Sequence, residues 1–167
     1  MNDTRSLSRL YAYDTWANAR VFAACQALDQ AQLEAGAPGT YGSIEDTLRH
    51  MVGVAHIYSL MLRDLPRDHE AAQDAFYARD LGWHAAHAAE LGVAYQGILA
   101  AADAAYLDAP LHVPWFDFAL TRLDGLLQVL THSAQHRAQV FSVLGGHGIE
   151  TPNLDYVELV NEEHAAR

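Results

Sequence analysis

The chain has 167 residues, of which 51% are hydrophobic, and this length and composition suit one globular domain, here expected to span residues 1–167. Ten Lys and Arg against 21 Asp and Glu give a formal net charge of -11, which argues against nucleic acid or an anionic membrane as a partner. The single cysteine excludes an internal disulfide and no apolar run resembles a signal peptide or membrane span, so we expect a cytoplasmic protein.

Hydrophobic periodicity predicts two long helices in the first part of the chain. Residues 4–28 repeat Leu, Ala and Val at helical spacing, and a Gly- and Pro-rich loop at 36–42 follows them. A second helix is expected to begin after Ser43, an N-cap residue with Asp46 as its capping-box partner, and to end near Pro66.

Two further helices are expected in the second half. Residues 67–74 are polar and predict a loop or a frayed helix, and the third periodic segment covers about 81–106. Two prolines in 107–120 favour an extended segment that covers one end of the fold. The fourth helix is expected from about Thr121 to the glycines at 145–148, since glycine ends helices readily.

Four amphipathic helices of this length predict an all-α fold, a four-helix bundle. The tail at 155–167 is expected to form one more short helix. The connection between the second and third long helices is longer than a tight turn, so the topology need not be a simple up-and-down arrangement.

Three histidines are predicted to meet inside the bundle. His132 and His136 lie four residues apart, on the shoulder of an apolar stripe centred on Leu130, and this spacing lets both reach one point. On the second helix His50 falls among inward apolar residues, whereas His56 falls on a charged face and is expected to be exposed. Three neutral imidazoles suit Zn²⁺ or Ni²⁺ and leave a coordination position open.

Other interpretations of these side chains stay open at this point. Each histidine can instead bond a buried polar partner, and His84 with His87 forms a rival pair that has no obvious third ligand. Ser133 occupies the place where HExxH metalloproteases carry their glutamate, and the sequence identifies no general base. Cys25 is expected to be a small core residue rather than a nucleophile.

The first helix places a carboxylate on its apolar stripe. Asp14 lies there with Asn18 one turn later, and Arg137 is the expected partner because a buried carboxylate needs one. These three residues form either a structural ion pair between the first and fourth helices or an outer shell that holds the histidine helix. Tyr11, on the same flank as Asp14, is an expected substrate contact.

Aromatic residues gather between the third and fourth helices. Trp115 and Phe116, with Phe118 beside them, are expected to form the wall of a substrate pocket. They can equally be a cap over the core.

The chain resembles the DinB-like (YfiT-like) family of four-helix metalloenzymes in three stretches, YDTWANARVF at 13–22, GSIEDTLRHMVGVAHIY at 42–58 and LLQVLTHSAQHRAQVFSVLGGHGIETPNLD at 126–155. The resemblance implies His50, His132 and His136 as ligands of a divalent ion such as Zn²⁺ or Ni²⁺, and it implies frequent homodimers. Relatives often have Gly where this chain has Ala138, and we expect little effect of that difference on ligation.

Three functions fit these predictions. Some members of the family use a low-molecular-weight thiol, so the first is a metal-dependent S-transferase that joins such a thiol to a small electrophile. The second is a metal-dependent hydrolase with activated water, and the third is a metal-binding bundle without catalysis.

Overall fold

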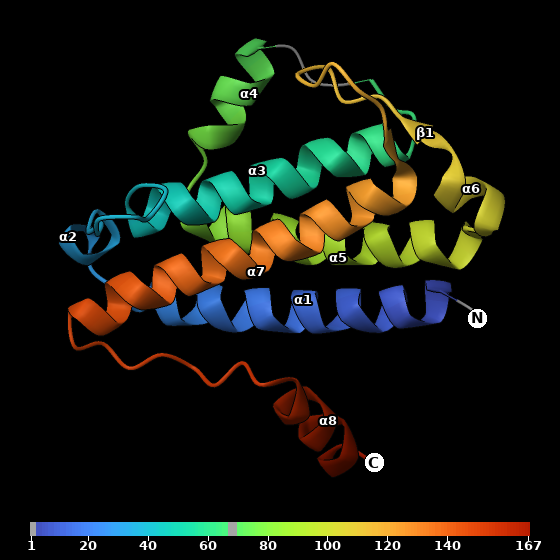
Figure 1. Ribbon diagram of the computed structural model, residues 1–167. Coiled ribbons are helices and arrows are strands. Elements are labelled where there is room, and N and C mark those ends of the chain that lie inside the picture. The colour runs from blue at the N-terminus through green and yellow to red at the C-terminus, as the bar shows by residue number, and fades with distance from the viewer. Residues whose placement is uncertain (1–2, 67–69) are drawn as a thin grey trace.

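The computed structural model describes residues 3–66 and 70–167 of the chain, so His69 and the start of the polar stretch at 67–74 lie outside the described residues. Four long helices pack side by side (Figure 1). They are α1 (Asp3–Gln26), α3 (Ile44–Leu62), α5 (Leu81–Ala101) and α7 (Arg122–Gly146). The predicted all-α four-helix bundle is therefore confirmed.

The helices do not follow one another around the bundle in chain order. Helix contacts run α1–α5–α3–α7 and close with α1, so α1 and α3 are diagonal neighbours. The colours of Figure 1 show α3 and α5 running in one direction and α1 and α7 in the other. The chain between α3 and α5 must therefore travel back along the bundle, and α4 (Glu70–Tyr77) lies on that return path. The topology is not a simple up-and-down one.

Shorter elements complete the fold. They are α2 (Gln30–Leu33), α6 (Ala104–Asp108), α8 (Tyr156–Ala165) and the antiparallel two-residue strands β1 (Pro110–Leu111) and β2 (Leu120–Thr121). The extended segment and the helical tail are confirmed. Of the helices in the described parts of the chain, none combines the length and apolarity needed to cross a bilayer.

The third long helix is shorter than predicted. The helix α5 ends at Ala101, and Asp103 then accepts a hydrogen bond from the backbone N–H of Tyr106 at 2.8 Å. An aspartate in this position caps the start of a new helix, so α6 begins there with its own direction. The predicted helix continued past this cap because the apolar residues of α6 follow those of α5 at helical spacing.

The buried face of α7 differs from the predicted one. The prediction centred the core on Leu130, but Leu127 is 41% exposed and Leu130 is only partly buried. The buried side of α7 keeps Leu126 and Leu144 of the predicted stripe and extends through the valines to His136 and Arg137. Because α7 packs more extensively against α3 than against α1, Leu127 and Leu130 line an apolar groove between α1 and α7.

Close approach of α1 and α5 depends on Gly92. A methyl group there would lie 2.4 Å from Thr15 Oγ1, and that hydroxyl is fixed by a 2.9 Å bond to the Tyr11 carbonyl. We expect Gly92→Ala to lower the free energy of unfolding by about 1 kcal/mol, because overpacking costs about 1–3 kcal/mol and exceeds the helix gain of up to about 1 kcal/mol. Chemical denaturation measures the change.

Gly97→Ala is the matched control in the same helix. Nothing lies within 4 Å of a methyl group at Gly97, so only the gain in helix propensity remains. This variant should be more stable than the wild type by up to about 1 kcal/mol. Equal effects of the two substitutions would contradict the close approach at Gly92.

Candidate metal centre

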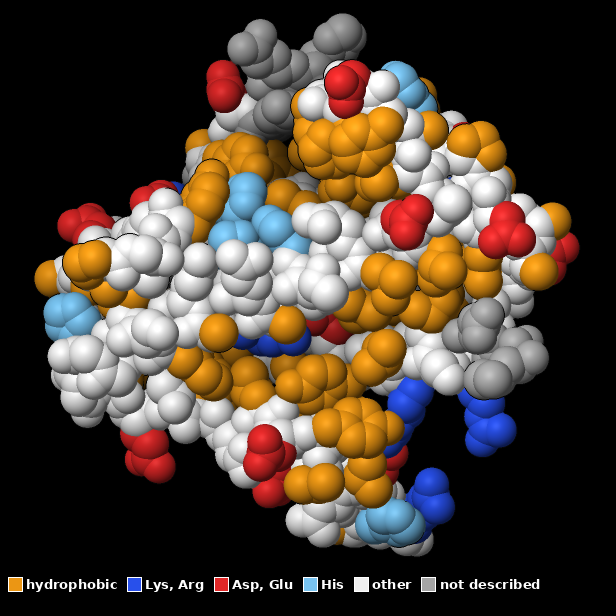
Figure 2. Space-filling model, in the orientation of Figure 1, with side chains coloured by type: hydrophobic (Ala, Val, Ile, Leu, Met, Phe, Trp, Pro, Cys, Tyr) orange, Lys and Arg blue, Asp and Glu red, His pale blue; other side chains and the backbone are white. Residues whose placement is uncertain are grey.

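Three imidazoles meet where α3 packs against α7. His50 Nε2 lies 3.1 Å from His132 Nε2, and His136 Nε2 lies 3.0 Å from the same atom. The i,i+4 spacing of the two α7 histidines and the packing of α3 on α7 bring the three rings together. Figure 2 shows pale-blue histidine side chains open to the surface over this seam, bordered by hydrophobic side chains. The predicted trio thus lies at one place.

The spacing of these nitrogens suits a bound cation. Two nitrogens each about 2.0–2.1 Å from an ion are separated by about 2.9 Å at a right angle and by about 3.3 Å at the tetrahedral angle. The two shortest separations, 3.0 and 3.1 Å, fall inside that interval. One ligand atom from each histidine lies within 4.8 Å of the others, so the group could hold a metal ion. Imidazole nitrogen is a suitable donor for Zn²⁺ and Ni²⁺.

Gln139 fixes the proton of one imidazole. His136 Nδ1 lies 2.7 Å from Gln139 Oε1, and an amide oxygen can only accept, so Nδ1 carries the hydrogen and Nε2 carries the lone pair. The backbone N–H of Tyr41 donates to the same oxygen at 3.3 Å. Sequence reasoning placed Gln139 on the wet face and missed this role, although its i,i+3 spacing from His136 was a usable signal.

Tyr41 covers one side of the cluster. Its ring stacks on His50 with centroids 3.9 Å apart and an interplanar angle of 12°, and it meets His136 edge-on at 5.6 Å. The side chain is 55% exposed, so it lies between the imidazoles and solvent. Tyr41 belongs to the Gly-rich loop before α3, and no helical periodicity could have predicted its contact.

The three histidines are neutral at pH 7. Burial, with the nearby His136, lowers the pKa of His50 to about 4, and the same causes together with His50 lower the pKa of His132 to about 4. Burial also lowers the pKa of His136, against the opposing effect of its bond to Gln139. Neutral imidazole is the form that binds metal ions.

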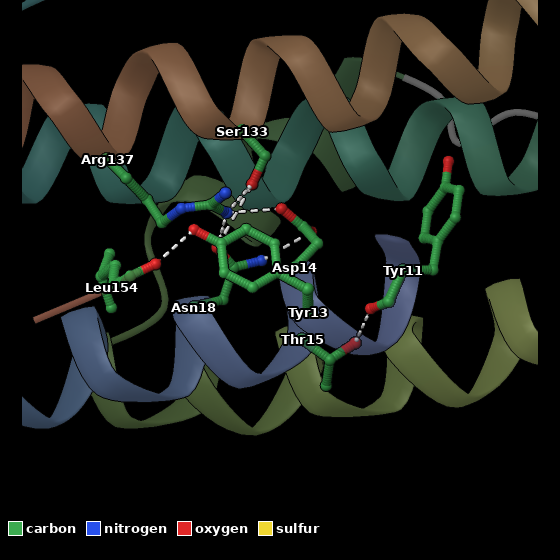
Figure 3. Close-up of polar contacts among 8 residues, drawn as sticks. All are labelled: Tyr11, Tyr13, Asp14, Thr15, Asn18, Ser133, Arg137 and Leu154. Carbon is green, nitrogen blue, oxygen red and sulfur yellow. Dashed lines mark hydrogen bonds and ion pairs between the residues drawn. The ribbon is translucent and has the colours of Figure 1, made fainter. Parts of the chain in front are cut away.

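A buried polar network lies about 100° around α7 from the histidines, toward α1 (Figure 3). Arg137 Nη1 contacts Asp14 Oδ1 and donates to Asn18 Oδ1 and Ser133 Oγ, each at 2.7 Å. Asn18 donates to the second Asp14 oxygen at 3.0 Å. The ring of Tyr13 lies beside the guanidinium, 5.9 Å from its carbon. The expected contact between Asp14 and Arg137 is present, and it joins α1 to the helix that carries two of the three histidines.

Two residues with uncertain expected roles lie in the core. Tyr11 is 1% exposed and donates from its hydroxyl to the Leu126 carbonyl at 2.9 Å, so it cannot reach a substrate at the protein surface. Cys25 is fully buried, and burial raises its thiol pKa to about 12. A thiol in that state is a core group, as predicted, because the thiolate is the nucleophilic form.

The aromatic loop lies farther along α3. Trp115 is 52% exposed and Phe116 is 38% exposed, and Trp115 packs edge-on against Tyr58. Tyr58 is eight residues beyond His50 in α3, which corresponds to about 12 Å along the helix axis. These two side chains are therefore partly exposed and lie at a distance from the three imidazoles, and Trp115 packs on the buried core residue Tyr58.

The remaining helix histidines are arranged differently from the prediction. The prediction that His56 is exposed is wrong, because it is partly buried and its Nδ1 lies 3.0 Å from His87 Nε2. His84 is fully buried, and neither of its ring nitrogens has a hydrogen-bond partner among the described residues. Within residues 3–66 and 70–167, only His50, His132 and His136 make a group of three metal-binding side chains, so His84 and His87 do not form a rival three-ligand site.

The burial of His84 should make the fold sensitive to acid. Burial, with the nearby Arg49 and His87, lowers its pKa from 6.5 to about 4. The unfolded chain therefore takes up this proton first, so the stability is complete above pH 6.5 and is lost as the pH falls toward about 4. We expect the free energy of unfolding of His84→Leu to fall less over this range, and to equal or exceed the wild-type value at pH 7 because no hydrogen bond is lost. Urea denaturation at several pH values measures both.

His112→Leu is the control for this experiment. His112 is exposed, so its replacement should leave the pH dependence of the wild type in place. A His84→Leu variant with the same loss of stability in acid as the wild type would contradict the prediction.

Comparison with known proteins gives a consistent result. A profile of the DinB family matches residues 1–165. YfiT from Bacillus subtilis, described as a probable metal-dependent hydrolase with an unusual four-helix bundle topology, superposes with a TM-score of 0.70 at 14% identity, over 86% of this chain and 89% of YfiT. The DinB-like protein YjoA from the same organism superposes with a TM-score of 0.62 at 13% identity, over 87% of this chain and 97% of YjoA. No curated protein matches the sequence significantly. Identities this low establish the shared fold.

Proposed function

The chain belongs to the DinB family, and from this premise we propose that it is a metal-dependent enzyme whose divalent ion is held by His50, His132 and His136. The observation that carries the proposal is the meeting of three Nε2 atoms, with separations of 3.0 and 3.1 Å, at the seam of two packed helices. The description of YfiT as a probable metal-dependent hydrolase supports a catalytic ion in a bundle of this topology.

The protein's own side chains prepare this site. Gln139 keeps the proton of His136 on Nδ1 and so directs the Nε2 lone pair toward the other two rings. Tyr41 excludes water from one face of His50 by stacking on it. His50, His132 and His136 would hold Zn²⁺ or Ni²⁺, and the bound ion would lower the pKa of a water molecule or a thiol.

Transfer of a thiol is the reaction that the surroundings favour. The hydrogen-bond partners of the three imidazoles within the described residues are one another and Gln139, and none is a carboxylate that could serve as a general base. A thiol has an ordinary pKa of about 8–9, so it loses its proton near neutral pH with little help. The sulfur of a low-molecular-weight thiol would then attack an electrophilic carbon of a small substrate. The new C–S bond of the thioether would replace the bond from that carbon to a leaving group, which departs with the electron pair, and the thiol proton would pass to solvent.

The shape of the surroundings suits a small substrate with an apolar part. Tyr41 borders the cluster directly, and the exposed rings of Trp115 and Phe116 offer an apolar wall at about 12 Å along α3, for the distal end of the substrate. The outer-shell role belongs to Asp14, Asn18 and Arg137, which hold α7 against α1 and thereby set the position of its histidines.

A metal-dependent hydrolase is the second candidate, because YfiT is described as one. The two reactions differ in their need for a thiol. Metal-loaded protein is incubated with a panel of small electrophiles and esters, with and without a low-molecular-weight thiol, and the products are identified by mass spectrometry. A thioether formed only with thiol supports the transferase, and a hydrolysis product independent of thiol replaces it with the hydrolase.

The matched control for both reactions is the His50→Ala variant, which should lose either activity. Absence of any product from a metal-loaded wild type would favour a non-enzymatic metal-binding bundle. We also propose that the chain is a single domain and forms a cytoplasmic homodimer. Light scattering on protein eluted from a size-exclusion column measures the molar mass and so tests the dimer.

A further inference from the structure

A second pair of imidazoles meets between α3 and α5, and the three-histidine cluster does not include it. His56 Nδ1 lies 3.0 Å from His87 Nε2. This separation equals the shorter one between neighbouring nitrogens of the three-histidine cluster. His56 follows His50 by six residues on α3, which turns it by about 240° around the helix and so toward a different neighbour.

A carboxylate orients one of the two rings. His87 Nδ1 lies 3.0 Å from Glu90 Oε2, and a carboxylate accepts, so Nδ1 carries the hydrogen and the lone pair of Nε2 points toward His56. Ligating histidines in metal sites are held in this way, by a carboxylate on the nitrogen that does not bind the ion.

Aromatic neighbours hold the pair in place. Trp83 stacks on His87 with centroids 4.9 Å apart and an interplanar angle of 18°. The ring of Phe76 lies 5.2 Å from His56 and 5.7 Å from His87. The His87 side chain is only 17% exposed, so its ring has little freedom to turn away from His56.

We propose that His56 and His87 form a second site for a divalent transition-metal ion, with water completing its coordination. Two nitrogens at about 2.0–2.1 Å from an ion are about 2.9 Å apart at a right angle, the angle of octahedral and square-planar sites. The 3.0 Å separation fits that geometry, which Ni²⁺ accepts. The site shares no ligand with the three-histidine cluster, so its test does not depend on whether the proposed function is correct. Within the described residues it has two protein ligands instead of three, so we expect it to bind its ion more weakly.

The test uses the full, untagged chain, stripped of metal and titrated with Ni²⁺ in a calorimeter. We expect two classes of site in the wild type, one tight and one weak. His87→Phe keeps a ring against Trp83 and should remove the weak class alone, whereas His50→Ala should remove the tight class alone. The control His112→Ala, at an exposed loop position, should leave both classes unchanged.

Glu90→Ala removes the orienting acceptor without disturbing the core, because the Glu90 side chain is 74% exposed. The weak class should lose affinity by about 10–100-fold in this variant. A single class of site in the wild type, or a weak class that persists unchanged in His87→Phe or in Glu90→Ala, would overturn the proposal.

A second readout does not depend on calorimetry. Because the ion would join α3 to α5, Ni²⁺ should raise the Tm of His50→Ala, in which the tight site is absent. The same addition should raise the Tm of the double variant His50→Ala, His87→Phe by less, because only the pair His132 and His136 remains there to bind the ion. An equal rise in both proteins would place the weak ion elsewhere and reject this site.

Discussion

Replacing His50 by alanine should abolish stoichiometric metal binding. Four-ligand zinc sites have apparent binding free energies of about 10–16 kcal/mol, or about 2.5–4 kcal/mol per ligand, so losing one of three imidazoles should weaken binding by about 10²–10³-fold. Plasma mass spectrometry of untagged protein, dialysed to remove weakly held ions, should find about one ion per chain in the wild type and far less in His50→Ala. The bundle should stay folded, because His50 is only partly buried.

The exposed residue His112 again provides the control, since His112→Ala should retain the full metal content. A polyhistidine tag must be absent, because it would bind ions itself. A wild type that takes up no ion after incubation with Zn²⁺ and with Ni²⁺ would contradict both the transferase and the hydrolase hypotheses. The three imidazoles would then contribute only to helix packing.

Arg137→Ala should cause the largest loss of stability among single substitutions of charged residues. Asp14 is 7% exposed, and among the described residues the Asn18 amide is the one side-chain donor that its carboxylate keeps without the guanidinium. Breaking a buried ion pair in this way costs about 3–5 kcal/mol. Urea denaturation at pH 7 measures the change. Arg9→Ala is the matched control, because the side chains of Arg9 and Glu163 are 35% and 40% exposed and their pair should contribute only about 0–1 kcal/mol.

The same variant separates the two roles of the network. If Arg137 also positions the α7 histidines, metal affinity of the folded Arg137→Ala protein should fall by about 10–100-fold. An unchanged affinity would make the pair purely structural. The double variant Asp14→Leu, Arg137→Met tests the electrostatic argument, since removing both charges together should recover much of the stability lost in Arg137→Ala. Stability losses of the same size in the single and double variants would contradict a cost from an unpaired carboxylate.

The three histidines could be predicted because their signals are short-ranged. Spacing of four residues brings His132 and His136 together in any helix, and the position of His50 on its own helix points it inward. The buried side of α7 was misjudged for a related reason. A helical wheel shows apolar arcs but not the neighbouring helix that each arc contacts. Leu126 and Leu144 are buried as predicted, whereas Leu127 and Leu130, predicted for the core side, line the groove beside α1.

Other contacts depend on the order of the helices, which periodicity does not determine. The meeting of His56 with His87 requires α5 to lie next to α3, and the consecutive helices α1 and α3 are in fact diagonal. Tyr41 reaches His50 from a loop whose path is set by backbone turns rather than by a repeating pattern. The break at Asp103 could have been found, since an aspartate three residues before Tyr106 is a capping signal inside an otherwise continuous apolar pattern.

The uneven distribution of the three imidazoles along the chain has a consequence for folding. His132 and His136 remain four residues apart in the unfolded chain, whereas His50 is 82 residues away from His132 and joins them only when α3 docks on α7. A divalent ion can therefore be chelated by the pair before the bundle exists, and it would favour the helical turn between them early in folding. The same chelation lets the ion bind the unfolded state, so the gain in Tm should level off as the metal concentration rises.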